Sequence, residues 1–446
     1  MISSKNDSIK YIIGELILLT FLGISQYFGI AATNLGIVFI MLSLFPFLPG
    51  KLQAESLLIA MPFFNMFSYK IGTTSLYYIF MILYSIQYLW RQRFKISQGK
   101  FICFFLSCLC TFTIFNMEIW GKWALRFWIM VLLFNNDELN RNLENTIRFT
   151  SVSAILSSII GYLMQINGKS IYTGGYVYIQ GTGATTRFAG LIGDPVFYGQ
   201  FIAVLIAANL VTAYQNKEHS RFSYIATVIM AIFALLSFSK TAILLIVLEY
   251  TGYLIVLAKE NAGKRRTILK SIYLIGVLCI AIALLYQYVV THTDSVLVQG
   301  FVTRFASNDL WTGRGDISKK YLEWLCSNWL YWLSGMPYSQ YTKGIAVGSN
   351  LITRTHNIFL ETACLFGVIP AVIILLCLCY YFFKLQSKYK LSIIVYLPLL
   401  ALLASGFSLH GHFEWHYYFL WSIAFACVQY NISRKDGCIY EVKASC

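Results

Sequence analysis

The segment 195-PVFYGQFIAVLIAANLVTAY-214 runs for twenty residues without a single charged side chain. An α-helix of about 20 mainly apolar residues is long enough to cross the hydrocarbon core of a bilayer. Inside that core only helices and closed barrels satisfy their backbone hydrogen bonds, and a long continuous apolar run is typical of the helix. The segment therefore predicts a transmembrane helix.

The composition of the whole chain agrees with this segment. Hydrophobic residues make up 58% of the 446 residues, charged residues only 12%, and the mean hydropathy is +0.65. A soluble domain carries roughly 25% charged residues. The composition therefore excludes a soluble globular protein. Because it does not change along the chain, we interpret residues 1–446 as a single integral membrane domain.

Apolar runs of similar length recur along the chain and predict an all-α polytopic membrane protein with about 12–14 transmembrane helices. The count is a range because three of the runs are close to the lower limit of roughly 17 residues. The runs lie near residues 10–28, 30–48, 52–68, 72–90, 101–117, 120–135, 149–166, 195–214, 222–239, 241–257, 271–289, 357–383, 391–408 and 413–430.

Basic residues are distributed unevenly between the two sides of these spans. About two thirds of the 34 Lys and Arg residues fall on the side that holds both termini, and cytoplasmic loops are the ones enriched in Lys and Arg. We therefore predict that both termini are cytoplasmic, including a tail at 431–446. The net charge of +15 reflects this bias, so it does not indicate a nucleic-acid partner.

Two external loops, 167–193 and 290–355, are too long to be simple connections. The second contains 317-ISKKYLEWLCSNWLYWLSG-335, which predicts an amphipathic helix with Asp316 as its N-cap and Gly335 as its stop. Its apolar stripe could face the outer leaflet or pack on the protein as a lid. The stripe consists of Ile317, Tyr321, Trp324, Leu325 and Trp332.

Cationic side chains gather where the external loops meet the spans. Arg187, Lys240 and Arg354 each lie within a few residues of a predicted span, and Arg304 and Arg314 flank 305-FASNDLWTG-313. A single arginine at the outer end of a span is most often a membrane anchor. As a group, guanidinium forks beside helix N-termini are suited to a phosphate or diphosphate.

His356 is the best candidate for acid–base chemistry, because imidazole titrates near neutral pH. His410, His412, Glu414 and His416 have a spacing that could bind a metal, although a polar belt at the interface is the favoured interpretation. No Asp-x-Asp motif occurs in the sequence, so we predict neither a metal nor another cofactor. Glu249, in the middle of a span, is an ionisable group without an assigned role.

The segment 356-HNIFLETACLFG-367, which follows a long external loop, resembles the signature of the Wzy-type O-antigen and capsular polysaccharide polymerase and O-antigen ligase superfamily. In that signature a His-Asn pair opens a helix and a glycine follows after nine intervening residues. The segment 187-RFAG-190 is similar to an external arginine motif of the family. A family turn that usually carries arginine resembles 239-SKTA-242, where Lys240 lacks the bidentate fork. The resemblance covers roughly residues 150–430.

The resemblance implies a metal-independent glycosyltransferase of capsule or lipopolysaccharide biosynthesis, in the bacterial cytoplasmic (inner) membrane. Its donor would be an oligosaccharide linked to undecaprenyl diphosphate, its acceptor a sugar hydroxyl, and its partners membrane lipid and the flippase and chain-length regulator of the same pathway. The residues themselves agree with this chemistry: we predict His356 as the catalytic base, with Arg187 and Arg314 stabilising the leaving diphosphate. We predict Arg304, Lys240, Arg354 and Asn357 as substrate-binding residues.

Three other functions remain open at this point. An O-antigen ligase, which transfers the glycan to lipid A core, shares the His-Asn motif. A flippase for the same lipid-linked oligosaccharides would more often show internal repeats and polar residues at the midplane. A scaffold without activity would not need the external cations. We favour the polymerase because the order His-Asn-x-Phe-Leu-Glu resembles capsule and O-antigen polymerases.

Overall fold

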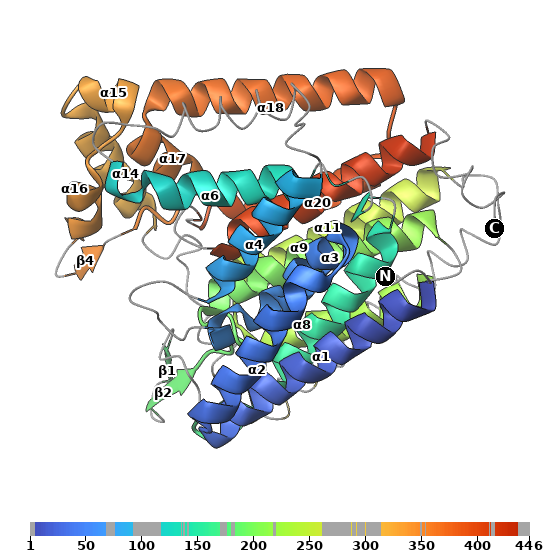
Figure 1. Cartoon of the computed structure of the whole chain (residues 1–446). Coiled ribbons are helices and arrows are strands. Elements are labelled where there is room, and N and C mark those ends of the chain that lie inside the picture. The colour runs from blue at the N-terminus through green and yellow to red at the C-terminus, as the bar shows by residue number, and fades with distance from the viewer. Residues whose placement is uncertain are drawn as a thin grey trace.

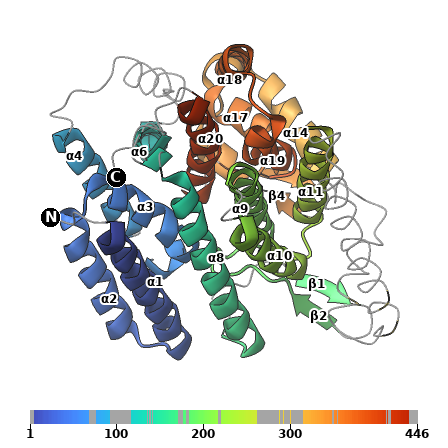
Figure 2. The same cartoon turned by 90° about the vertical axis from the view of Figure 1, so that its right-hand side faces the viewer.

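The computed structural model shows a bundle of long helices with a layer of shorter helices at one end (Figures 1 and 2). It describes residues 5–67, 76–91, 117–134, 136, 139, 140, 142–169, 176–179, 183–216, 220–260, 287, 291, 299, 314–347, 350–352, 354–409, 411 and 415–435. Its α-helices are α1 (Lys5–Phe28), α2 (Ala31–Leu44), α3 (Gly50–Ala60), α4 (Tyr77–Arg91), α6 (Met117–Phe134), α8 (Leu143–Ile166), α9 (Pro195–Gln215), α10 (Ser220–Leu236), α11 (Lys240–Glu260), α14 (Arg314–Cys326), α15 (Leu330–Ser334), α16 (Tyr338–Lys343), α17 (Ile358–Phe366), α18 (Val368–Tyr389), α19 (Leu397–Gly406) and α20 (Trp415–Lys435).

Short 3-10 segments and two small hairpins complete the described chain. The 3-10 segments are η1 (Phe45–Phe47), η2 (Met61–Phe67) and η4 (Ile393–Tyr396), and each continues into or out of an α-helix. The hairpins are antiparallel and two-stranded: β1 (Tyr176–Ile179) pairs with β2 (Gly183–Thr186), and β3 (Ile345–Val347) pairs with β4 (Asn350–Ile352).

The structure confirms an all-α polytopic membrane protein. Among the described residues, five helices are long and apolar enough to cross a bilayer, namely Ser8–Phe28 of α1, α8, α9, Lys240–Lys259 of α11, and α18. Four shorter apolar helical segments, 31–47, 123–133, 220–236 and 393–406, accompany them. Apart from residues 117 and 287, the predicted runs at 101–117 and 271–289 lie outside the described residues, so the total of 12–14 spans stays a prediction.

Helix α9 forms the centre of the bundle, with α8, α10, α11, α19 and α20 packed around it (Figure 2). Small residues allow close approach, because a Cβ on Gly199 would come within 2.6 Å of the Ala242 methyl group. Polar side chains also join the helices: the Asn209 amide donates to Ser151 Oγ at 2.7 Å, and the Gln200 amide donates to Ser405 Oγ at 2.7 Å. Small residues and isolated hydrogen bonds are what holds helices together in lipid.

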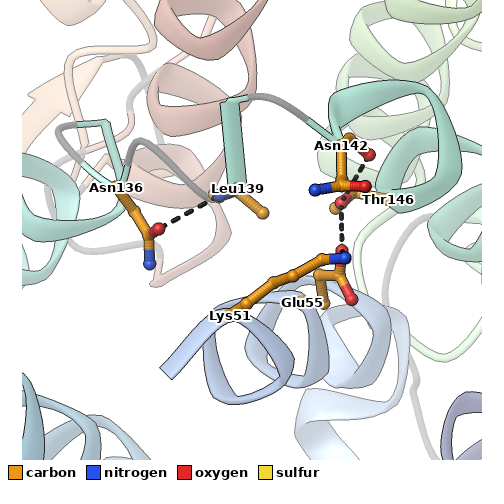
Figure 3. Close-up of polar contacts among 6 residues, drawn as sticks. All are labelled: Lys51, Glu55, Asn136, Leu139, Asn142 and Thr146. Carbon is orange, nitrogen blue, oxygen red and sulfur yellow. Dashed lines mark hydrogen bonds and ion pairs between the residues drawn. The ribbon is translucent and has the colours of Figure 1, made fainter. Parts of the chain in front are cut away.

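A second polar cluster joins α3 to α8 (Figure 3). Glu55 is buried, accepts a hydrogen bond from Thr146 Oγ1 at 3.2 Å, and lies 3.9 Å from Lys51 Nζ. Thr146 also contacts the carbonyl of Asn142 at 3.3 Å. Nearby, Ser56 donates to the buried carboxylate of Glu15 on α1. The carboxylates of Glu15 and Glu55 thus bind hydroxyl groups of neighbouring helices and link α1, α3 and α8.

Contacts between helix ends show which ends lie together at each end of the bundle. The end of α20 meets the start of α8 through Tyr430 Oη and Glu144, 2.6 Å apart. The end of α8 meets the end of α1, where Lys169 Nζ donates to the Tyr27 carbonyl at 3.2 Å. The start of α1 and the end of α20 therefore lie at one end of the bundle, here called the tail end. The opposite end, which carries residues 187–194, 237–241 and 354–358, is called the site end.

The predicted helix at 317–335 is divided into two helices in the structure. α14 ends at Cys326 and α15 begins at Leu330, because Asn328 Oδ1 accepts from the Leu330 amide at 3.0 Å and Ser327 Oγ donates to the Trp324 carbonyl at 2.7 Å. Such local side-chain bonds compete with a continuous helix. α14 begins at Arg314, so Asp316 lies in its first turn rather than at its cap.

The apolar stripe of this segment packs mainly on the protein. Ile317, Tyr321 and Leu325 are buried against α17, whereas Trp332 is 44% exposed. Gly335 ends α15 with φ 73°, as predicted for a stop residue. α14 therefore packs on the protein, while Trp329, Leu330, Trp332 and Leu333 in and just before α15 are exposed.

The predicted span 357–383 is also divided, at Gly367. This residue has φ 101°, and a Cβ there would come within 2.8 Å of the Leu333 carbonyl group. Only glycine combines a left-handed conformation with such a close backbone approach. The turn separates the short α17 from α18 and locks α17 against α15.

We expect cysteine labelling to place the site end outside the cell. Ser339, on α16, is exposed at the site end, and Ser387, on α18, is exposed at the tail end. In a variant without native cysteines, Ser339→Cys should react with an impermeant maleimide in intact cells. Ser387→Cys, the matched control, should react only after permeabilisation. The reverse pattern would invert the orientation inferred from the basic residues.

Candidate functional site

Segments that are far apart in sequence converge at the site end. Arg187 Nε donates to the Ser237 carbonyl at 2.9 Å, which joins the segment before α9 to the turn between α10 and α11. Thr241 Oγ1 and Ser408 Oγ lie 2.8 Å apart, which joins that turn to the end of α19. Phe407 packs on Phe359 of α17, with ring centroids 4.8 Å apart. Through these contacts the predicted arginine motif, the predicted lysine turn and the His-Asn motif form one continuous region.

The segment that carries Arg187 is held from several sides. The Phe188 amide donates to the Leu236 carbonyl at 3.2 Å, and the Asn65 amide donates to the carbonyls of Leu191 and Ile192 at 3.0 and 2.8 Å. Arg187 itself is half-buried. Its guanidinium group is therefore held by a fixed loop, as a preorganised charge requires.

Lys240 is half-buried and is the first residue of α11. Ser239 Oγ accepts a hydrogen bond from the Ala242 amide at 3.3 Å, which is the geometry of an N-cap. The ammonium group thus lies where the helix dipole is positive. Lys240 and the Ser237 carbonyl that binds Arg187 belong to the same tight turn, so the structure brings these two predicted cations together.

The helix N-termini at the site end are already capped by side chains. Asp194 Oδ1 accepts from the Val196 and Phe197 amides at 2.7 and 3.1 Å. Asn357 Oδ1 accepts from the amides of residues 359 and 360, at 3.0 and 3.1 Å. These helix ends therefore offer fewer unbound backbone amides to a phosphate than predicted, because the capping side chains already accept hydrogen bonds from the amides of the first turn. Asn357 serves as the N-cap of α17.

His356 has an unusual backbone conformation. Its φ is 51°, in the left-handed region, where a residue other than glycine costs roughly 1–3 kcal/mol. The residues on either side are tied together, since Thr355 Oγ1 donates to the Asn357 carbonyl at 3.0 Å. His356 is half-buried. Phe238 and Lys390 have similar φ values, 49° and 45°, so the strain is consistent with a functional role of His356 but does not by itself identify the reacting group.

Arg354 lies on the side of the site that faces α14. Burial raises the pKa of the Tyr321 phenol, and the positive charge of Arg354 opposes that rise. Arg354 is half-buried. Arg354 therefore lies close to the layer of short helices α14, α15 and α16, here called the outer helical layer.

The structure leaves several predicted residues undescribed. Arg314 is the first residue of α14, but its side chain lies outside the described part, as does Arg304 as a whole. His410, His412 and Glu414 also lie outside it. His416 is buried in α20 with its ring centroid 5.2 Å from that of Phe197. Within the described residues no three His, Cys, Asp or Glu side chains form a metal-like group.

An apolar groove was not foreseen from the sequence. It encloses about 350 Å³ between α17, α18, α19, α20 and α6, and its walls include Phe127, Phe359, Ile374, Leu375 and Trp421. α18 lies at the edge of the bundle with no buried residue, so one wall of the groove is a peripheral helix (Figure 1). The helix that forms another wall, α17, is the one that His356 and Asn357 precede. The uniform hydrophobicity of α18 gave no signal of the groove, because it fits a helix packed inside the bundle as well as one at its edge.

A comparison with known protein families supports the family resemblance inferred from the sequence. Residues 225–375 match the family model Wzy_C, described as O-antigen ligase, which confirms the resemblance seen in the sequence. The match indicates a membrane glycosyltransferase-like protein of O-antigen-related polysaccharide biosynthesis, of ligase or polymerase type. The matched stretch contains Lys240, Arg354 and His356, whereas Arg187 precedes it. No curated protein and no solved structure matches the chain.

Proposed function

We propose that the protein polymerises lipid-linked oligosaccharide repeat units on the external face of the bacterial cytoplasmic membrane. The donor is a glycan attached to undecaprenyl diphosphate, and the acceptor is a sugar hydroxyl of another repeat unit. The observation that carries this proposal is the apolar groove beside α17, because a polyprenyl chain needs an apolar path that ends at the reacting diphosphate. The strained His356 stands at the head of that same helix.

The chemistry can be assigned to residues of the site end. His356 accepts the proton of the acceptor hydroxyl while the oxygen of that hydroxyl attacks the anomeric carbon of the donor sugar. The bond from that carbon to the diphosphate oxygen breaks, and the diphosphate leaves with one additional negative charge. Arg187 and Lys240, with Arg314, Arg304 and Arg354 from the long loop, stabilise that charge. No metal is needed for these steps.

The proposal is tested with purified protein in lipid nanodiscs supplied with an undecaprenyl-diphosphate-linked repeat unit. We expect a ladder of polymers to form from this donor alone, with release of undecaprenyl diphosphate. Product that appears only when lipid A core is added would instead establish a ligase. Movement of the donor across a vesicle bilayer without any new glycosidic bond would establish a flippase and contradict the proposal.

The groove can be tested with two tryptophan substitutions on α18. Ile374 lines the groove, whereas its neighbour Ile373 is 47% exposed on the outside of the helix. Ile374→Trp fills part of the groove and should lower the kcat/KM for the undecaprenyl donor by about tenfold, equivalent to 1.4 kcal/mol. Ile373→Trp, the matched control, should have little effect.

A donor with a short prenyl chain shows whether Ile374→Trp acts through the lipid chain. The wild type should use this donor poorly, and Ile374→Trp should change its use less than about twofold, since the short chain would fill little of the groove. An equal loss for both donors would show that the substitution acts on the site rather than on binding of the lipid chain.

A further inference from the structure

Glu361 is a buried acidic residue for which the proposed chemistry has no use. It lies in the first turn of α17 and has no exposed surface. An ionised carboxylate in such a position is costly unless several donors satisfy it. Its hydrogen-bond partners therefore indicate why the chain keeps it.

The two oxygens of Glu361 bind two different segments. Oε2 accepts from the backbone amide of Gly411 at 2.7 Å, in the segment that leads into α20. Oε1 accepts from the hydroxyl of Tyr341, on α16, at 3.4 Å. The carboxylate thus joins α17 to the outer helical layer and to the segment before α20.

Tyr341 continues the connection to the strained residue. Its hydroxyl oxygen accepts from the Thr355 amide at 3.3 Å, so one phenol bridges Glu361 and the residue just before His356. The ring is fully buried and packs on Tyr321 with centroids 5.5 Å apart. Burial, and next the nearby Glu361, raise the pKa of Tyr341, which keeps the phenol protonated and able to donate.

The conformation at His356 is determined by its neighbours on both sides. Thr355 is held by Tyr341 through its amide and donates to the Asn357 carbonyl through its hydroxyl. Asn357 is fixed as the cap of α17. A left-handed histidine persists only where the surrounding contacts determine it. The Glu361–Tyr341–Thr355 series supplies one set of these contacts, and the cap of α17 supplies another.

We propose that Glu361 is a positioning residue that holds His356 in its left-handed conformation through Tyr341 and Thr355. The inference rests on the proposed function, in which His356 receives the acceptor proton. The same carboxylate also binds Gly411, four residues before α20, and aromatic residues of α20 form a wall of the groove. Glu361 thereby sets the base and the lipid groove in a fixed relation without touching the substrate itself.

A carboxylate suits this role better than an amide. Gln at this position would offer one acceptor oxygen and an NH₂ group, which cannot accept from either the Gly411 amide or the Tyr341 hydroxyl. The bond to Gly411 or the bond to Tyr341 would be lost in Glu361→Gln, and the bond between Tyr341 and Glu361 would be lost in Tyr341→Phe. Both variants keep nearly the same volume, so packing is preserved.

The test measures kcat and KM of purified variants with the lipid-linked donor. Displacing a base by about 1 Å can cost on the order of 100-fold in rate. We expect Tyr341→Phe and Glu361→Gln to lower kcat about 10- to 100-fold and to leave the KM for the donor within about twofold. The matched control is Tyr331→Phe, which removes a hydroxyl that donates to Gln340 Oε1 at 3.0 Å in the same outer layer. Its kcat should stay close to that of the wild type.

A second measurement separates positioning from general destabilisation. In a His356→Ala background the base is already absent, so adding Tyr341→Phe should not lower the residual rate further. A further loss in that background, or a kcat equal to that of the wild type in the single variants, would overturn the proposal. A wild type that forms no glycosidic bond would instead overturn the proposed function, so the two failures are distinguishable.

Discussion

We expect Arg187→Ala to lower glycan transfer by about 100- to 1,000-fold, the usual cost of removing one preorganised group that stabilises a developing anion. The guanidinium is oriented by the bond from Nε to the Ser237 carbonyl, in the turn that also carries Lys240. It can therefore meet the leaving diphosphate without reorganising. Arg187→Lys should recover little activity, because an ammonium group lacks the planar fork that binds two phosphate oxygens.

The measurement is turnover by purified protein, at matched amounts of folded protein. Arg221 provides the control, because it is an exposed arginine at the start of α10, on the tail end of the bundle. Arg221→Ala should keep nearly the full rate. Full-length polymer made by Arg187→Ala at wild-type protein levels would remove Arg187 from the diphosphate site.

The features that could be predicted from the sequence are the local ones. The apolar run at 195–214 corresponds closely to α9, since length and hydrophobicity alone specify a spanning helix. The start of a helix at the His-Asn pair and the stop at Gly335 were also foreseen, because each depends on the chemistry of one side chain or on the absence of one. The family match supports the motif that begins at His356.

The features that could not be predicted depend on contacts between distant segments. The break at Gly367 follows from the backbone of α15 lying against it, and nothing near Gly367 in the sequence indicates this neighbour. The bonds from Glu361 to Gly411 and Tyr341 likewise join residues 50 and 20 positions apart. The groove arises because α18 stands away from the bundle, which hydrophobicity cannot distinguish from close packing.

The structure changes the expected source of positive charge at the site end. Helix N-termini at the site end were expected to add to the attraction for phosphate, but Asp194 and Asn357 cap those of α9 and α17. The positive charge of the site must therefore come mainly from side chains. This makes Arg187 more important than the sequence alone indicates.

The second large effect is expected at His356. A general base contributes about 10²–10⁴-fold in rate, so His356→Ala should be nearly inactive while still inserting into the membrane and binding donor. Activity of the wild type should fall on the acidic side of a pH 5–9 series, because a protonated imidazole cannot accept the acceptor's proton. EDTA should leave turnover unchanged. Loss of activity on chelation would contradict the metal-independent mechanism and direct attention to His410, His412 and His416.

The left-handed backbone makes His356→Asn the most informative substitution. Asparagine tolerates positive φ better than alanine does, so this variant should keep the conformation seen at φ 51° and a thermal stability close to that of the wild type. It also keeps a hydrogen-bonding side chain but cannot take up a proton near neutral pH. If His356 is the base, His356→Asn should be as inactive as His356→Ala despite its better stability. If it retains a large part of the wild-type kcat, His356 only orients the acceptor, and the base must be sought among external carboxylates such as Asp194 or Glu323.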